Sequence, residues 1–104
     1  MFIDWEYWRI GFAASDLAYM IALHWYPDRR ARHEMPLLRA YHAALGPQVR
    51  YGWDALVSDY RFAHLDNVSV PVYQHKIGLF PAVWWSHLER WFLAFEDLDC
   101  EDLL

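Results

Sequence analysis

The alternation of apolar and polar residues predicts a mostly helical chain that begins with one short strand. Residues 1–5 are apolar or aromatic apart from Asp4, which suits a strand ending at Asp4 or Trp5. An irregular stretch to about residue 13 is expected to follow. Ser15 is a favoured N-cap residue, and Asp16 would then lie in a first helical turn, where the helix dipole favours negative charge. The segment from there to about residue 25 is apolar almost all round, which predicts a helix buried in a larger body.

Further helical segments follow, separated by proline and glycine. Residues 28–45 are rich in Arg and Ala and end at Gly46-Pro47, and Pro36 within them is expected to kink or split the helix. A third helix is expected from residue 53, and over 68–73 a helix is favoured although the pattern also fits a strand. The last helix is expected to begin at Pro81, a position where proline is tolerated. Its apolar stripe is too wide for one neighbouring helix: Trp84, Trp85, Leu88, Trp91, Phe92, Phe95 and Leu98.

The composition of this chain, a single domain of 104 residues, limits its possible partners and its cellular compartment. Hydrophobic residues make up 57% and aromatic residues 19%, which is more than a chain of this size buries easily, so self-association or docking on a further segment is expected. The formal net charge of −5 disfavours nucleic acid and anionic membranes as partners. The single cysteine, Cys100, excludes an internal disulfide and fits a reducing compartment. No apolar run reaches transmembrane length and no signal-peptide pattern is present, so a cytoplasmic location is expected.

Histidine and serine positions do not form a familiar catalytic motif. His33-Glu34 begins like the helix of a zinc protease, but residue 37 is Leu, so the second histidine ligand is missing. His24 lies in the apolar segment and is expected to be a hydrogen-bonded core residue. None of the serines lies in a glycine-flanked turn, which argues against a hydrolase triad.

Two aspartates separated by a glycine carry the clearest functional signal. Asp4 follows the predicted strand, Gly11 comes next, and Asp16-Leu17-Ala18 opens the predicted helix. This segment resembles the metal-binding segment of the aminoglycoside phosphotransferase and choline kinase superfamily, the small-molecule relatives of protein kinases. The resemblance continues through most of the chain, at Glu34, Leu37-Leu38, Tyr41-His42, Trp53, Asp59-Tyr60-Arg61, Trp84-Trp85, Leu88-Glu89-Arg90, Ala94-Phe95 and Leu103-Leu104. It corresponds to the last third or so of a complete member.

The resemblance implies the helical C-terminal lobe of a kinase-like phosphotransferase, which transfers the γ-phosphate of ATP to an acceptor hydroxyl. It implies that Asp4 holds Mg²⁺, an ion that takes few oxygen ligands from the protein and the rest from phosphates and water. Asp16 would either tie down the catalytic loop or cap its own helix. Tyr60, Trp85 and Trp91 would line an acceptor pocket, because aromatic faces attract organic cations, whereas the plainer interpretation is core packing. An aminoglycoside, an amino alcohol, a sugar and a lipid-like alcohol are all compatible acceptors.

Several parts that a kinase-like enzyme needs are missing from residues 1–104. The glycines, at 11, 46, 52 and 78, are too far apart for a phosphate-covering loop, and the only lysine, Lys76, comes late in the chain. The family's His-Gly-Asp catalytic loop with a later Asn is also absent, so the N-terminal lobe and this loop would have to come from elsewhere. We therefore expect the isolated chain to be inactive and to bind Mg²⁺ and ATP weakly or not at all. The alternative hypothesis is a non-catalytic helical interaction module, or a truncated relic, that docks on a partner chain.

Overall fold

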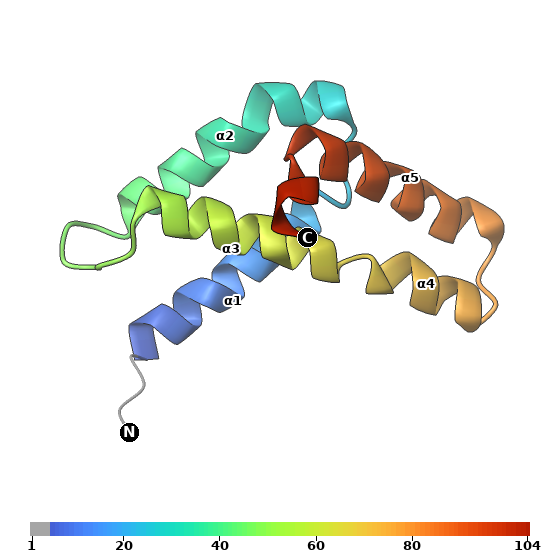
Figure 1. Cartoon of the computed structure of the whole chain (residues 1–104), viewed down its shortest axis with the longest axis horizontal. Helices are drawn as coiled ribbons and strands as arrows, with labels where there is room; N and C mark the ends of the chain where they lie inside the picture. The colour runs from blue at the N-terminus through green and yellow to red at the C-terminus, as the bar shows by residue number, and fades with distance from the viewer. Residues whose placement is uncertain (1–4) are drawn as a thin grey trace.

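The computed structural model describes the backbone of residues 5–104 and the side chains from residue 13 onwards, and this part of the chain is helical (Figure 1). No strand occurs within it. Five α-helices are followed by a short 3₁₀ helix: α1 (Trp5–Met20), α2 (Pro27–Ala44), α3 (Trp53–Asp66), α4 (Ser69–Lys76), α5 (Pro81–Asp97) and η1 (Cys100–Leu103). A mostly α fold, as the hydrophobic pattern predicts, is therefore confirmed.

The N-terminal region differs from the prediction. Trp5 begins a continuous helix, so the predicted strand does not include Trp5. The prediction of an irregular stretch up to about residue 13 is also wrong, because the same helix covers it. Residues 1–4, on which the rest of the predicted strand falls, lie outside the described part. A strand here would need a second strand to pair its backbone groups, and the described chain supplies none, whereas a helix pairs these groups internally. Ser15 and Asp16 consequently lie inside α1 and cap no helix N-terminus. Gly11 in the interior costs only about 1 kcal/mol relative to alanine, which one position in a 16-residue helix can absorb.

The α1 helix is also less buried than its composition predicts. Its inner face buries Ala14 and Ala18 completely, and the turn that follows α1 buries Ile21. Tyr19 and Met20 on the other side remain 46% and 48% exposed. From residue 13 to its end, the helix therefore has one packed face, as expected of an amphipathic surface helix, instead of being enclosed all round.

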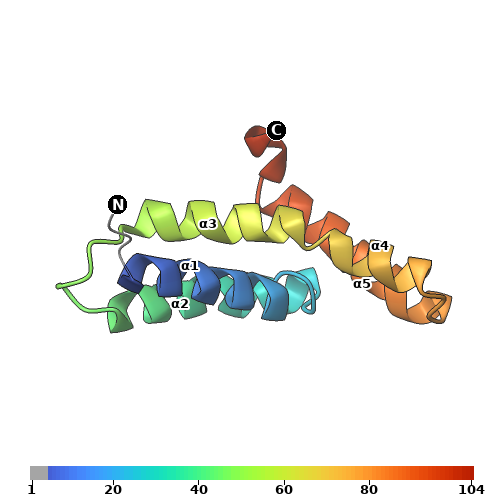
Figure 2. The ribbon, with the colours of Figure 1, turned by 90° about the horizontal axis from the view of Figure 1, so that it is seen from below.

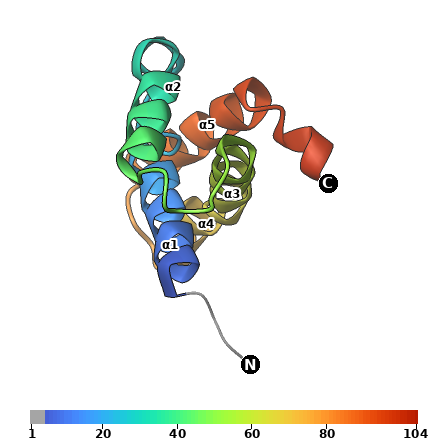
Figure 3. The ribbon, with the colours of Figure 1, turned by 90° about the vertical axis from the view of Figure 1, so that its left-hand side faces the viewer.

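The helices form a packed body from which one helical hairpin projects. The helix α1 packs chiefly against α3. Both α1 and α2 lie on one side of α3, while η1 lies on the opposite side (Figures 2 and 3). The α4–α5 pair forms the hairpin at the other end (Figure 1). Buried side chains from α1, α2, α3, α5 and η1 and from the adjoining turns meet in one core: Ala14, Ala18, Ile21, Ala22, Leu38, Tyr51, Leu56, Tyr60, Ala94, Leu98 and Cys100.

The remaining helix boundaries follow local sequence signals. Gly46 adopts φ +83° just beyond α2 and is followed by Pro47, an arrangement that ends helices because glycine tolerates the left-handed conformation. Pro36 does not split α2. The segment after α3 is helical, as favoured, and Pro81 opens α5 as predicted. Within residues 5–104, no helix combines the length and the apolar composition that crossing a bilayer requires.

Candidate functional site

The two predicted aspartates provide no metal centre within the described residues. Asp4 lies outside that part of the chain, and Asp16 is an exposed residue of α1. Among the described side chains, those of residues 13–104, no group of three or more His, Cys, Asp or Glu comes together. A Mg²⁺ role for Asp4 and the loop-anchoring role of Asp16 both stay predictions.

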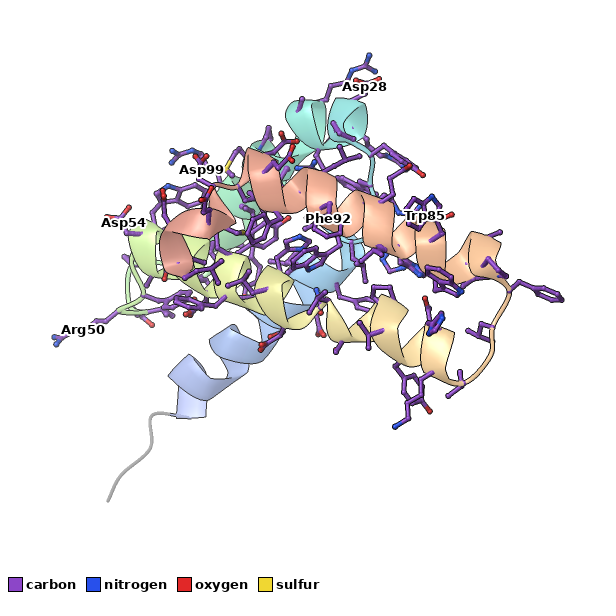
Figure 4. All side chains as sticks on the ribbon, turned by 45° about the vertical axis from the view of Figure 1, so that its right-hand side comes forward. Asp28, Arg50, Asp54, Trp85, Phe92 and Asp99 are labelled. Carbon is purple, nitrogen blue, oxygen red and sulfur yellow. The ribbon has the colours of Figure 1, made fainter. Side chains whose placement is uncertain are left out.

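The three predicted aromatic pocket residues occupy two different environments. Tyr60 in α3 is fully buried, and Trp91 in α5 is 8% exposed, so both belong to the interior. Trp85 is 56% exposed on α5, at a distance from Phe92 along the same helix (Figure 4). The structure thus does not bring the three side chains into one wall, and Trp85 is the member that an external ligand can reach.

A polar network runs through the interior between α2, α3 and α5. The Arg30 guanidinium lies 2.7 Å from Asp97 Oδ2 and 3.6 Å from Glu34 Oε1. The Tyr60 hydroxyl donates a hydrogen bond of 2.6 Å to Glu34 Oε2. Arg30 and Glu34 are buried, while the Asp97 side chain is half exposed. The network therefore connects three helices and reaches the surface only at Asp97.

Burial controls the protonation of this network. It raises the pKa of Glu34 above the ordinary value of 4.5, and this effect outweighs the opposing hydrogen bond from Tyr60 and the charge of Arg30. Burial, together with the neighbouring Glu34 carboxylate, also raises the pKa of Tyr60. Tyr60 is consequently held as a neutral donor and is unsuited to act as a nucleophile or base. The arrangement fixes helix positions and offers no reactive group to a substrate.

A second buried contact joins α3 and α5 through an imidazole and an indole. His64 Nε2 donates to the carbonyl oxygen of Trp91 at 3.0 Å, and Trp91 Nε1 donates to the carbonyl oxygen of His64 at 2.7 Å. The two rings stack with centroids 5.5 Å apart. Burial lowers the pKa of His64, so the ring is neutral and carries its proton on Nε2. Trp91 is therefore a hydrogen-bonded core residue.

Two hollows in the described part of the surface border α4. One of about 250 Å³ lies between α4 and α5, which is below the roughly 300–1,000 Å³ usual for small-molecule pockets. Its lining comes from Pro71, Val72, His75, Trp84 and Leu88. A second, of about 550 Å³, follows α4 and the turn after it and is lined by Ser69, Val70, Tyr73, Gln74, Ile77 and Leu79. Neither lining includes Tyr60, Trp85 or Trp91, and neither contains a carboxylate.

The sequence contained a signal for part of the polar network only. Arg30 and Glu34 stand four residues apart on one helix, the spacing at which opposite charges meet. Asp97 is 67 residues from Arg30, and no local pattern connects the two. Comparison with protein-family models, with curated proteins and with solved structures gives no match.

Proposed function

We propose that this chain supplies the C-terminal helical part of an ATP-dependent small-molecule phosphotransferase that phosphorylates an acceptor hydroxyl. The observation that carries the proposal is the Asp4, Gly11 and Asp16-Leu17-Ala18 segment, whose family resemblance continues along nearly the whole chain. The nucleotide-covering loop, the strand lysine and the catalytic base would come from another segment or another chain.

The helical architecture and the positions of two residues support the proposal that this chain supplies the C-terminal helical part. Glu34 and Tyr60, two positions that carry the resemblance, meet in the interior and hold α2 against α3. Arg30 joins α2 to α5 through Asp97, so the same network holds three helices in fixed positions, which suits a part that positions an acceptor. Of the three predicted pocket residues, Trp85 is the one exposed to a cationic acceptor such as an aminoglycoside or an amino alcohol.

The test begins with the coding sequence upstream of this segment, in which we expect His-Gly-Asp followed four residues later by Asn. The protein that contains both parts is then assayed for ATP-dependent phosphorylation of aminoglycosides, amino alcohols and sugars. Asp4→Asn should abolish transfer, because the lost carboxylate would hold the metal, whereas Asp66→Asn at an exposed position of α3 should leave transfer unchanged. Equal activity in the Asp4→Asn protein would contradict the proposal.

Assays of residues 1–104 alone form the second arm. We expect no ATP turnover with any acceptor, since each missing part contributes orders of magnitude to the rate. Turnover that survives purification and disappears in Asp4→Ala would show that the chain holds a more complete active site than this proposal allows.

The second candidate is a non-catalytic interaction module, favoured by the exposed apolar side chains of the α4–α5 hairpin. Phe80, Val72, Tyr73 and Trp85 are 82%, 60%, 61% and 56% exposed. Apolar surface gathered in this way marks association sites. This candidate would be favoured if the complete protein phosphorylates none of the acceptors and binds a second chain stably through this hairpin.

A further inference from the structure

Two histidines from distant parts of the chain face one another on the surface. His24 lies in the turn after α1 and is exposed, which corrects the expectation that it is a core residue. His87 lies on α5, and its Nε2 atom is 3.3 Å from His24 Nε2. The two ring centroids are 5.0 Å apart with the ring planes at 81°.

The other nitrogen of each ring faces an oxygen acceptor. His24 Nδ1 lies 2.6 Å from the carbonyl oxygen of Tyr19, and His87 Nδ1 lies 2.9 Å from Gln74 Oε1. Each Nδ1 must carry a proton to donate these bonds, so each neutral ring has an unprotonated Nε2. Two lone pairs then point at one another across 3.3 Å, an arrangement that a cation between them would stabilise.

We propose that His24 and His87 form a two-histidine site for a divalent first-row transition metal such as Zn²⁺ or Ni²⁺, bound through both Nε2 atoms. Two nitrogens at about 2.0–2.1 Å from Zn²⁺ in tetrahedral geometry lie roughly 3.3–3.4 Å apart, which matches the observed separation. Imidazole suits this class of metal, and metal-bound histidines typically donate their second N–H to a carbonyl or carboxylate. Tyr19 and Gln74 occupy those outer positions.

The surrounding contacts hold the two rings in place before any metal binds. Arg90, one turn after His87 on α5, donates from Nε to the carbonyl oxygen of Leu23 at 3.0 Å, which fixes the backbone next to His24. Burial, His24 and the positive charge of Arg90, in that order, lower the pKa of His87.

The site offers two protein ligands, because no third His, Cys, Asp or Glu joins them within the described residues. Water or a further ligand would fill the remaining positions. Neither His24 nor His87 is among the residues that carry the proposed phosphotransferase role, so metal binding at this pair is tested independently of that role.

Calorimetric titration of the full chain with Zn²⁺ and with Ni²⁺, near neutral pH, tests the proposal. We expect one metal ion per chain and no comparable response to Mg²⁺, which prefers oxygen ligands. His24→Ala and His87→Gln should each weaken binding by about tenfold or more, since each removes one of two ligands. The matched control is His33→Ala, an exposed histidine of α2 outside the pair, which should bind as the unaltered chain does.

A second pair of variants tests the outer contact at Gln74. Gln74→Glu supplies an oxygen that only accepts hydrogen bonds at neutral pH and should tighten Zn²⁺ binding several-fold, while Gln74→Leu should weaken it. In the opposite case, Gln74 donates its amide N–H to His87 Nδ1 and the ring proton is on His87 Nε2. The two Nε2 atoms then share a hydrogen bond and bind no metal, and Gln74→Glu would not tighten Zn²⁺ binding, which would contradict the proposal.

Nitrogen-15 NMR of the imidazoles provides a readout that does not depend on affinity. Zn²⁺ should shift both Nε2 resonances of the pair and leave both Nδ1 atoms protonated. Absence of metal binding, binding that survives loss of either histidine, or a shared proton between the rings with no response to Zn²⁺ would each overturn the proposal.

Discussion

Replacing Tyr60 by Phe tests whether the buried polar network stabilises the fold. The change keeps the ring and removes only the hydroxyl that donates to Glu34, so it creates almost no cavity. Hydrogen bonds to charged groups contribute about 1.5–3 kcal/mol, and the loss leaves a buried carboxylate oxygen with one partner fewer. We expect the free energy of unfolding at neutral pH to fall by about that amount, and the melting temperature by about 4–8 °C for each kcal/mol lost.

The loss should depend on pH in a direction that the environment of Glu34 fixes. The pKa of Glu34 is raised in the folded chain, so the folded state binds its proton more tightly than the unfolded state, and this residue lowers stability as the pH rises above about 4.5. The Tyr60 hydroxyl opposes this effect because it stabilises the ionised carboxylate. In Tyr60→Phe the destabilisation should therefore shrink toward the roughly 0.5–1.5 kcal/mol of a neutral hydrogen bond as Glu34 becomes protonated.

Urea unfolding followed by circular dichroism, at pH values on both sides of this transition, provides the measurement. Tyr73→Phe makes the same chemical change at a position that is 61% exposed and should alter stability by less than about 0.5 kcal/mol. A Tyr60→Phe chain as stable as the Tyr73→Phe control, or a loss that does not change with pH, would refute the argument.

Three further variants test the core, the buried histidine and the hairpin. Leu56→Ala, at a fully buried position, should cost about 2–5 kcal/mol in the same unfolding experiment, and a cost below about 1 kcal/mol would contradict the core described here. Because the pKa of His64 is lowered in the folded chain, stability should fall as the pH drops below about 6.5, and His64→Gln should remove part of that fall in a pH series of melting curves. Phe80→Ser together with Trp85→Ser should reduce self-association in sedimentation experiments without loss of stability, since both side chains are exposed, and unchanged association would exclude the hairpin as the contact surface.

Local signals in the sequence were enough to place most helices. Gly46-Pro47 and Pro81 act through their own backbone geometry, so the end of α2 and the start of α5 were predicted correctly. The N-terminal region failed because its conformation depends on what lies beside it. Ser15 can cap a helix, but it also fits inside one when the preceding residues continue the helix toward Trp5.

The difference between local signals and long-range packing also explains which contacts of the candidate site could be predicted from the sequence. The pairing of Arg30 with Glu34 follows from their spacing on one helix. The pairing of His24 with His87 spans 63 residues and depends on how the turn after α1 meets α5, which no short pattern encodes. Trp85 and Trp91 belong to one apolar stripe in the sequence, and only the packing of α3 against α5 decides that Trp91 is inside and Trp85 outside.

The attachment of α4 has a consequence for how the chain opens. This helix packs chiefly against α5, and Pro71 is its only fully buried side chain, so little apolar area opposes its release. Segments held in this way exchange their amide hydrogens through local unfolding, at a free energy below that of the whole fold. In hydrogen-exchange experiments, the amides of α4 should therefore exchange before those of α1 and α3. Gln74 connects α4 to the histidine pair, and an occupied pair would slow the release of this helix while leaving the rest of the exchange pattern in place.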